Sequence, residues 1–124
     1  MKKIRSHREL DVYKMSFNAS MNLFELSKAF PREEQYSLTD QVRRSSRSVS
    51  ANISEAFRKR KYPKLFISKL SDAEAEAAET QTWLDFALKC NYINMDIYKK
   101  IDREYDHIIG KLVNMARCPE KWAV

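Results

Sequence analysis

The near absence of glycine is the feature that most limits the fold of this sequence. The chain has one glycine, Gly110, in 124 residues, whereas globular proteins average about 7% glycine. Tight hairpin turns and phosphate-binding loops both depend on glycine. An all-β fold and a glycine-built nucleotide site are therefore strongly disfavoured, and the sequence predicts helices joined by a few short loops.

Apolar residues recur every three or four positions along four segments, which is the period of an α-helix. Those of the first segment form two adjacent rows, Leu10, Tyr13, Phe17, Met21 and Phe24 in one and Val12, Ala19, Leu23, Leu26 and Phe30 in the other. Two rows make a wide stripe, so this helix should contact more than one neighbour. We place the helices at about 8–29, 38–61, 63–89 and 95–117. They predict an all-α, antiparallel, up-down-up-down four-helix bundle in a single domain, residues 1–124.

Local signals refine this prediction. Ser37 and Asp40 have the spacing of a capping box at the start of the second helix, and Asn94 is suited to cap the fourth. Gly110 lies inside the fourth helix, where glycine costs about 1 kcal/mol relative to alanine. Close packing against a neighbouring helix would explain it. Small side chains in the second helix, mostly serines between residues 45 and 54, indicate that helices approach closely there.

The sequence carries no signal for export or for membrane insertion. Cys90 and Cys118 are too few for a disulfide framework. The N-terminus lacks the apolar run of a signal peptide, and no stretch approaches the roughly 18 apolar residues of a membrane span. We therefore expect a cytoplasmic protein with reduced thiols and no membrane association.

The net charge of +6 is concentrated in one part of the chain. Residues 40–64 carry 8 basic and 2 acidic side chains, whereas residues 65–124 carry 8 basic and 10 acidic ones. On a helical wheel, the arginines of the second helix fall on an arc opposite its apolar residues, and a basic run extends positive charge around the helix end. The candidate binding residues are Arg43, Arg44, Arg47, Arg58, Lys59, Arg60 and Lys61.

This basic surface has two interpretations. Arginine suits phosphate oxygens, so the surface is a candidate for binding RNA or DNA. Alternatively, it is an ordinary solvated face, or it pairs with acidic residues of the third helix, within one chain or between subunits. Those acidic residues are Asp72, Glu74, Glu76 and Glu79. Binding to an anionic membrane is disfavoured because the apolar face of this helix is needed for the core.

No group of residues suggests catalysis or metal binding. Glu104 and His107 have the Glu-x-x-His spacing of di-iron bundles, but such sites need a second pair and two further glutamates. His7 has no matching glutamate, and Cys90 and Cys118 do not form a C-x-x-C pair. We therefore predict no enzyme, no catalytic residue, no metal and no cofactor.

Aromatic side chains near a basic surface could stack on the bases of single-stranded nucleic acid. The candidates near predicted loops or at the surface are Tyr36, Tyr62, Tyr92, Trp83 and Trp122. Packing in the core or at an interface is the more common role of such residues.

A longer pattern spans the second helix. It reads Phe30-Pro31-x-x-Glu34-x-Tyr36-Ser37-Leu38-Thr39-x-Gln41-Val42-Arg43-Arg44-Ser45-Ser46-x-Ser48-Val49-x-x-Asn52-Ile53-Ser54-Glu55-Ala56. Together with residues 7–13 and 73–92, it resembles a bacterial four-helix bundle family. Its members include proteins encoded in intervening sequences of large-subunit ribosomal RNA genes, and they are often labelled ribosomal proteins. The sequence resembles the accessory variability determinant of diversity-generating retroelements more distantly.

The resemblance implies an antiparallel bundle that assembles as a homopentamer around a central channel. It also implies a basic surface for nucleic acid and, among the retroelement relatives, a reverse-transcriptase partner. It implies no enzyme. Asn52 and Glu55 match the family motif and suit a polar contact between helices or subunits. Two positions depart from the family pattern, since Ala56 and the pair Ala75-Glu76 stand where glycine and Gly-Ser are usual.

These observations favour a non-enzymatic, oligomeric accessory protein that binds nucleic acid, either structured RNA or DNA. The alternative is a structural or protein-interaction oligomer that binds no nucleic acid and whose basic surface is neutralised by a neighbour.

Overall fold

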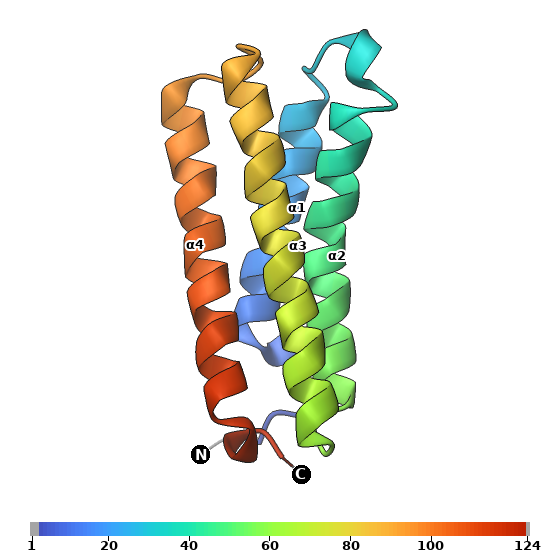
Figure 1. Ribbon diagram of the computed structural model, residues 1–124, viewed down its shortest axis with the longest axis vertical. Coiled ribbons are helices and arrows are strands. Elements are labelled where there is room, and N and C mark those ends of the chain that lie inside the picture. The colour runs from blue at the N-terminus through green and yellow to red at the C-terminus, as the bar shows by residue number, and fades with distance from the viewer. Residues whose placement is uncertain (1–2, 124) are drawn as a thin grey trace.

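Four long helices form an antiparallel bundle in the computed structural model, which describes residues 3–123 (Figure 1). They are α1 (Asp11–Ser27), α2 (Leu38–Arg58), α3 (Pro63–Lys89) and α4 (Met95–Arg117). Three short 3-10 turns flank the helices. They are η1 (His7–Glu9) before α1, η2 (Arg32–Glu34) before α2 and η3 (Pro119–Lys121) after α4. Successive helices run in opposite directions (Figure 1), so the predicted all-α, up-down-up-down bundle is confirmed.

Two helices are shorter than predicted. Helix α1 begins at Asp11 rather than near Arg8 because Leu10 is extended, and a capping box between Ser6 and Glu9 closes η1 as a separate turn. Helix α2 ends at Arg58, so residues 59–62 form the turn to α3. The helical wheel therefore does not apply to Lys59, Arg60 and Lys61. Among residues 3–123, no helix is long and apolar enough to cross a bilayer.

The core is built from one face of each helix. Large side chains that are almost fully buried come from all four helices: Leu23, Val49, Ile53, Phe57, Phe66, Leu70, Leu84, Tyr105, Ile108 and Leu112. Helix α1 contacts both α2 and α4, as its wide apolar stripe predicts. Its two rows differ, however, because Phe17 and Met21 of the first row remain 49% and 46% exposed.

Serine side chains hold the small-residue face of α2 against its neighbours. Ser46 Oγ lies 2.9 Å from Ser20 Oγ on α1, and Ser45 Oγ lies 2.8 Å from Thr80 Oγ1 on α3. Both pairs are buried, and each hydroxyl has its hydrogen bond within the bundle. The expected close approach of helices at α2 is confirmed, and it brings interhelical hydrogen bonds that the sequence pattern did not specify.

A glutamate in the preceding turn, rather than Ser37, caps the start of α2. Glu34 Oε1 accepts hydrogen bonds from Ser37 Oγ at 2.6 Å and from the Leu38 backbone N–H at 3.3 Å. Glu34 Oε2 accepts a third from the Tyr92 hydroxyl, at 2.8 Å, in the loop between α3 and α4. The predicted Ser37–Asp40 capping box does not form, whereas Asn94 caps α4 as predicted by accepting a bond from the Ile97 N–H.

The Glu34–Tyr92 contact makes the stability of the fold depend on pH under both acidic and alkaline conditions. Hydrogen bonds from Ser37 and Tyr92 hold the pKa of Glu34 below its ordinary 4.5, so this stabilisation is present above that value and is lost as the pH falls through the lowered pKa. The hydrogen bond to Glu34 raises the pKa of Tyr92 to about 12. The stabilisation from Tyr92 is therefore present below the ordinary pKa of 10.0 and is lost as the pH rises through about 12.

We therefore expect the melting temperature, followed by circular dichroism, to decline on both sides of a plateau between these limits. Replacement Tyr92→Phe should lower the plateau and reduce the alkaline decline. Tyr98, whose pKa is also raised to about 12 by its hydrogen bond to Asp85, contributes to that decline, as does Tyr105, whose pKa is raised by burial. An unchanged profile for Tyr92→Phe would contradict a contribution from this contact.

Gly110 is exposed inside α4, and a Cβ added there would meet nothing within 4 Å. The close packing expected at this position is therefore absent from the protomer. Because glycine destabilises a helix interior, Gly110→Ala should raise the free energy of unfolding by about 1 kcal/mol. Chemical denaturation followed by circular dichroism measures this. Destabilisation instead would mean that another subunit packs closely against this position.

Candidate nucleic-acid interface

The seven basic candidates form two groups rather than one continuous surface. Arg43, Arg44 and Arg47 lie in the first half of α2, whereas the others follow at its end and in the next turn. Arg58 follows Arg47 by 11 positions, which corresponds to about 16 Å of helix. Mostly small and uncharged side chains occupy this interval. We call the first group the upper basic group and residues 58–61 the lower basic group.

Two arginines of the upper basic group lean against α1. The Arg43 guanidinium lies 4.8 Å from the centre of the Phe24 ring, and its Nε donates to Ser27 Oγ at 2.8 Å. The Arg47 guanidinium lies 5.7 Å from the same ring, and Lys28 Nζ lies 4.8 Å from it. Three cations therefore surround one phenyl ring. Such contacts orient the arginines while leaving guanidinium donors for an anion.

Arg44, like Arg47, is an exposed member of the upper basic group. Its side chain is 74% exposed and lies 3.8 Å from Asp40, one turn earlier. An exposed pair of this kind contributes about 0–1 kcal/mol, so a phosphate could replace Asp40 at little cost. Among residues 3–123, the ion pairs do not link α2 arginines to the acidic residues of α3. Neutralisation by α3 within one chain is therefore absent.

The lower basic group is only partly available. Arg60 folds back over the end of α2, where its Nη1 donates to the Phe57 carbonyl at 3.0 Å and its guanidinium lies 3.9 Å from the Phe57 ring centre. This arginine has a structural role, because it closes the helix end. Lys61 lies 5.2 Å from the Tyr62 ring, whereas Arg58 is exposed and Lys59 is half-buried.

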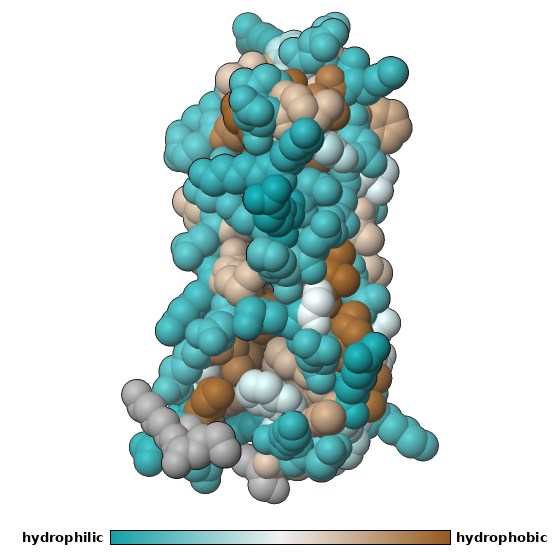
Figure 2. All heavy atoms as spheres, turned by 90° about the vertical axis from the view of Figure 1, so that its left-hand side faces the viewer, coloured by the Kyte–Doolittle hydropathy of each residue, from teal (hydrophilic) through white to brown (hydrophobic). Residues whose placement is uncertain are grey.

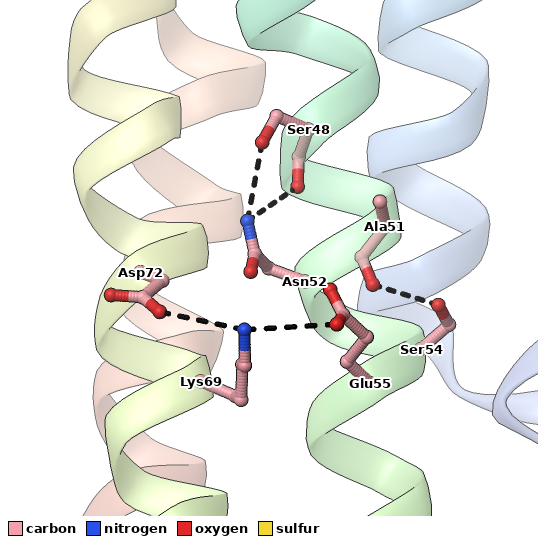
Figure 3. Close-up of polar contacts among 7 residues, drawn as sticks. All are labelled: Ser48, Ala51, Asn52, Ser54, Glu55, Lys69 and Asp72. Carbon is pink, nitrogen blue, oxygen red and sulfur yellow. Dashed lines mark hydrogen bonds and ion pairs between the residues drawn. The ribbon is translucent and has the colours of Figure 1, made fainter.

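The motif residues Asn52 and Glu55 lie on the side of α2 that faces α3 (Figure 3). Glu55 pairs with Lys69 of α3 at 3.7 Å, and Lys69 also approaches Asp72 at 3.9 Å. Asn52 Nδ2 donates to the Ser48 carbonyl at 2.9 Å, within α2. The expected contact between helices is thus made by Glu55, while Asn52 bonds within its own helix.

The predicted stacking aromatics are scattered. Tyr36 is 88% exposed in the turn before α2, and Tyr62 is exposed after the lower basic group. The Tyr92 hydroxyl donates a hydrogen bond to Glu34. Trp83 and Trp122 are half-buried and pack against the core. On α1, Phe24 lies beside Arg43 and Arg47, and Phe17 lines a groove that Arg47 borders. Sequence reasoning assigned both phenylalanines to a core row, and their exposure could not be read from the apolar period alone.

A separate hollow opens between α1 and α4 near the lower end of the bundle, where Figure 2 shows apolar atoms among hydrophilic ones. Its volume is about 540 Å³, and its lining includes Leu10, Val12, Met115 and Trp122. Acidic and basic side chains both border it, so it does not extend the basic surface of α2.

Histidines and cysteines do not gather at any point. His7 packs edge-on against the Tyr13 ring at 4.8 Å, His107 is exposed on α4, and Cys90 and Cys118 are free thiols. Within the described part of the chain, no three His, Cys, Asp or Glu side chains come together as they would to hold a metal ion.

The fold and its basic second helix define a small all-helical bundle, and comparison with known proteins places it in a family. The model for the 23S rRNA-intervening sequence protein family matches residues 8–114, and the chain belongs to that family. A solved structure from Bacteroides thetaiotaomicron, a protein of unknown function from the S23 ribosomal protein family, is similar with a TM-score of 0.78. It is 29% identical and covers 86% of this chain and 95% of its own. No curated protein matches the chain.

Proposed function

We propose that this protein is a non-enzymatic, oligomeric accessory protein that binds RNA or DNA through the basic side chains of α2. The observation that carries the proposal is the upper basic group. Arg44 is exposed and weakly paired, and Arg43 and Arg47 are oriented by Phe24. The acidic residues of α3, which would have neutralised this group in the alternative interpretation, make no ion pair with it inside the protomer.

Oligomerisation is part of the proposal. The exposed apolar side chains Leu65 and Ile67 of α3 indicate a surface that a monomer in water would leave uncovered. The family resemblance implies a homopentamer, which would repeat the upper basic group five times, so that weak contacts to one nucleic acid would combine. We place the protein in the cytoplasm, where structured RNA and DNA are both available. A reverse-transcriptase partner is expected only if the gene belongs to a retroelement.

The double replacement Arg44→Glu with Arg47→Glu tests the assignment. It reverses two charges on exposed side chains, so the fold should persist while affinity for nucleic acid falls roughly a hundredfold through lost phosphate contacts and new repulsion. Fluorescence anisotropy with labelled RNA and DNA measures the affinity. The matched control is Lys99→Glu with Lys100→Glu on α4, which changes the net charge equally. Equal loss in both variants would mean that net charge, and not the α2 surface, determines binding.

A further inference from the structure

Helix α1 presents an uncovered apolar row directly beside the upper basic group. Tyr13 and Phe17 have ring centres 6.0 Å apart, and Met21 and Phe24 continue the same side of the helix one and two turns later. Phe17 and Met21 are about half exposed. Tyr13 packs partly against the core, but the core of the protomer does not cover Phe17 and Met21, so the exposure of these two side chains requires another explanation.

A groove of about 310 Å³ runs between this row and α2. Aromatic and thioether side chains form one wall, Arg47 borders it on α2, and small side chains form the rest of its lining. The lining comprises Tyr13, Phe17, Ser20, Met21, Arg47, Ser50, Ala51 and Ser54. None of these residues is acidic. The groove therefore has an apolar surface, a cation at its border and no carboxylate. These properties suit a ligand that carries both planar apolar rings and phosphate groups.

The serine hydroxyl groups of the groove already form hydrogen bonds within the protein. Ser20 pairs with Ser46 at 2.9 Å, Ser50 pairs with Ser16 at 2.9 Å, and Ser54 donates to the Ala51 carbonyl at 2.7 Å. These groups are therefore poorly placed to read the hydrogen-bonding edges of a particular base. Contact through the face of a base, which every base presents, is what the groove offers.

From this geometry we infer that the α1–α2 groove binds unpaired nucleotides, with bases stacked on Phe17 and Met21 and phosphates held by Arg47 and Arg43. This inference rests on the proposed function and narrows its ligand to single-stranded nucleic acid or single-stranded loops of structured RNA. In a duplex the base faces are stacked on one another, and only an unpaired strand can turn them toward an aromatic side chain. Binding is expected to tolerate changes of sequence.

A second exposed phenylalanine provides the matched control. Phe86 of α3 is 53% exposed, and its ring lies 5.9 Å from the Trp83 ring. Its neighbour in sequence, Asp85, accepts a hydrogen bond from the Tyr98 hydroxyl, whereas Phe17 lines its groove together with Arg47. Loss of either phenyl ring should leave the core intact, but only Phe17 lies where a phosphate chain is attracted.

The test compares labelled oligouridine with an RNA duplex of equal length by fluorescence anisotropy, on protein whose mass is fixed by light scattering. Phe17→Ala with Met21→Ala should weaken oligouridine binding about tenfold or more and leave duplex binding unchanged. Phe86→Ala should change neither. Because the replaced side chains are not cationic, the salt dependence of the remaining binding should be unaltered.

Three results would overturn the inference, and they are distinguishable. If the Phe17 and Met21 variant binds oligouridine normally while the Arg44 and Arg47 variant does not, the phosphate surface stands and the stacking does not. If neither variant loses affinity, the proposed function fails as well. If the Phe17 and Met21 variant has a smaller mass, the groove is a contact between subunits and not a nucleotide site.

Discussion

Replacing Phe57 with alanine is expected to lower the free energy of unfolding by about 4 kcal/mol, which is a typical loss for a buried phenylalanine. Phe57 is only 2% exposed near the end of α2. Its removal leaves a cavity that the surrounding helices can fill only in part. A loss of this size is a large fraction of the roughly 5–15 kcal/mol that stabilises a typical domain.

Phe57 also supports the lower basic group, because the Arg60 guanidinium rests on its ring. The variant should therefore release Arg60 from the end of α2 in addition to weakening the core. Chemical denaturation followed by circular dichroism, at one protein concentration, measures the change. The control is Phe86→Ala, which removes an exposed ring and should cost no more than about 0.5 kcal/mol. Similar losses in the two variants would contradict the burial that the structure assigns to Phe57.

The second large effect is expected at Ser46 of α2, whose hydroxyl lies 2.9 Å from that of Ser20 on α1 in the buried contact between the two helices. Ser46→Leu inserts extra carbon atoms into a fully buried position, which typically costs about 1–3 kcal/mol. It also leaves the buried Ser20 hydroxyl without its partner, at a further cost of about 1–3 kcal/mol. We expect a total loss of about 3 kcal/mol and a shift of α1 away from α2.

A double-mutant cycle separates the two causes. Ser46→Ala removes the hydrogen bond without adding volume, so its cost should be smaller than that of Ser46→Leu. Adding Ser20→Ala should recover part of this cost, because removing both partners leaves no unpaired hydroxyl. If Ser46→Leu is tolerated with less than about 1 kcal/mol of loss, α1 and α2 are not packed as closely as the structure indicates.

The helices could be predicted from the sequence because apolar residues recur at helical spacing along each of them. The face of α1 that is buried could not be predicted in this way. Three serines, Ser16, Ser20 and Ser27, occupy that face and form hydrogen bonds there. A pattern based on hydrophobicity therefore could not distinguish the exposed row, which contains Phe17 and Met21, from the buried row, which contains Val12 and Leu23. Which row faces inward depends on how α2 and α4 are placed, and that is a property of the whole bundle.

The candidate interface could likewise be predicted from the sequence only in part. The concentration of arginine on α2 and its position opposite the apolar face were evident from spacing alone. The partners of these side chains were not, because Phe24, Ser27 and Phe57 meet the arginines only after folding. Arg60 is the clearest case, since its sequence position suggests a free cation whereas its contacts close a helix end. The cap from Glu34 was missed for a related reason, because it lies in a turn outside the usual capping pattern.

The most direct test of the account is the salt dependence of binding to RNA and DNA, on protein whose oligomeric mass has been fixed by light scattering. If the upper basic group and the accessible part of the lower group contact phosphates, log affinity should fall linearly with log salt concentration. Each phosphate contact adds about 0.7 to the slope for a single strand, so four contacts per protomer predict a slope near −3. An oligomer that binds neither nucleic acid even at low salt would contradict the account, and the basic side chains of α2 would then belong to a protein-interaction surface.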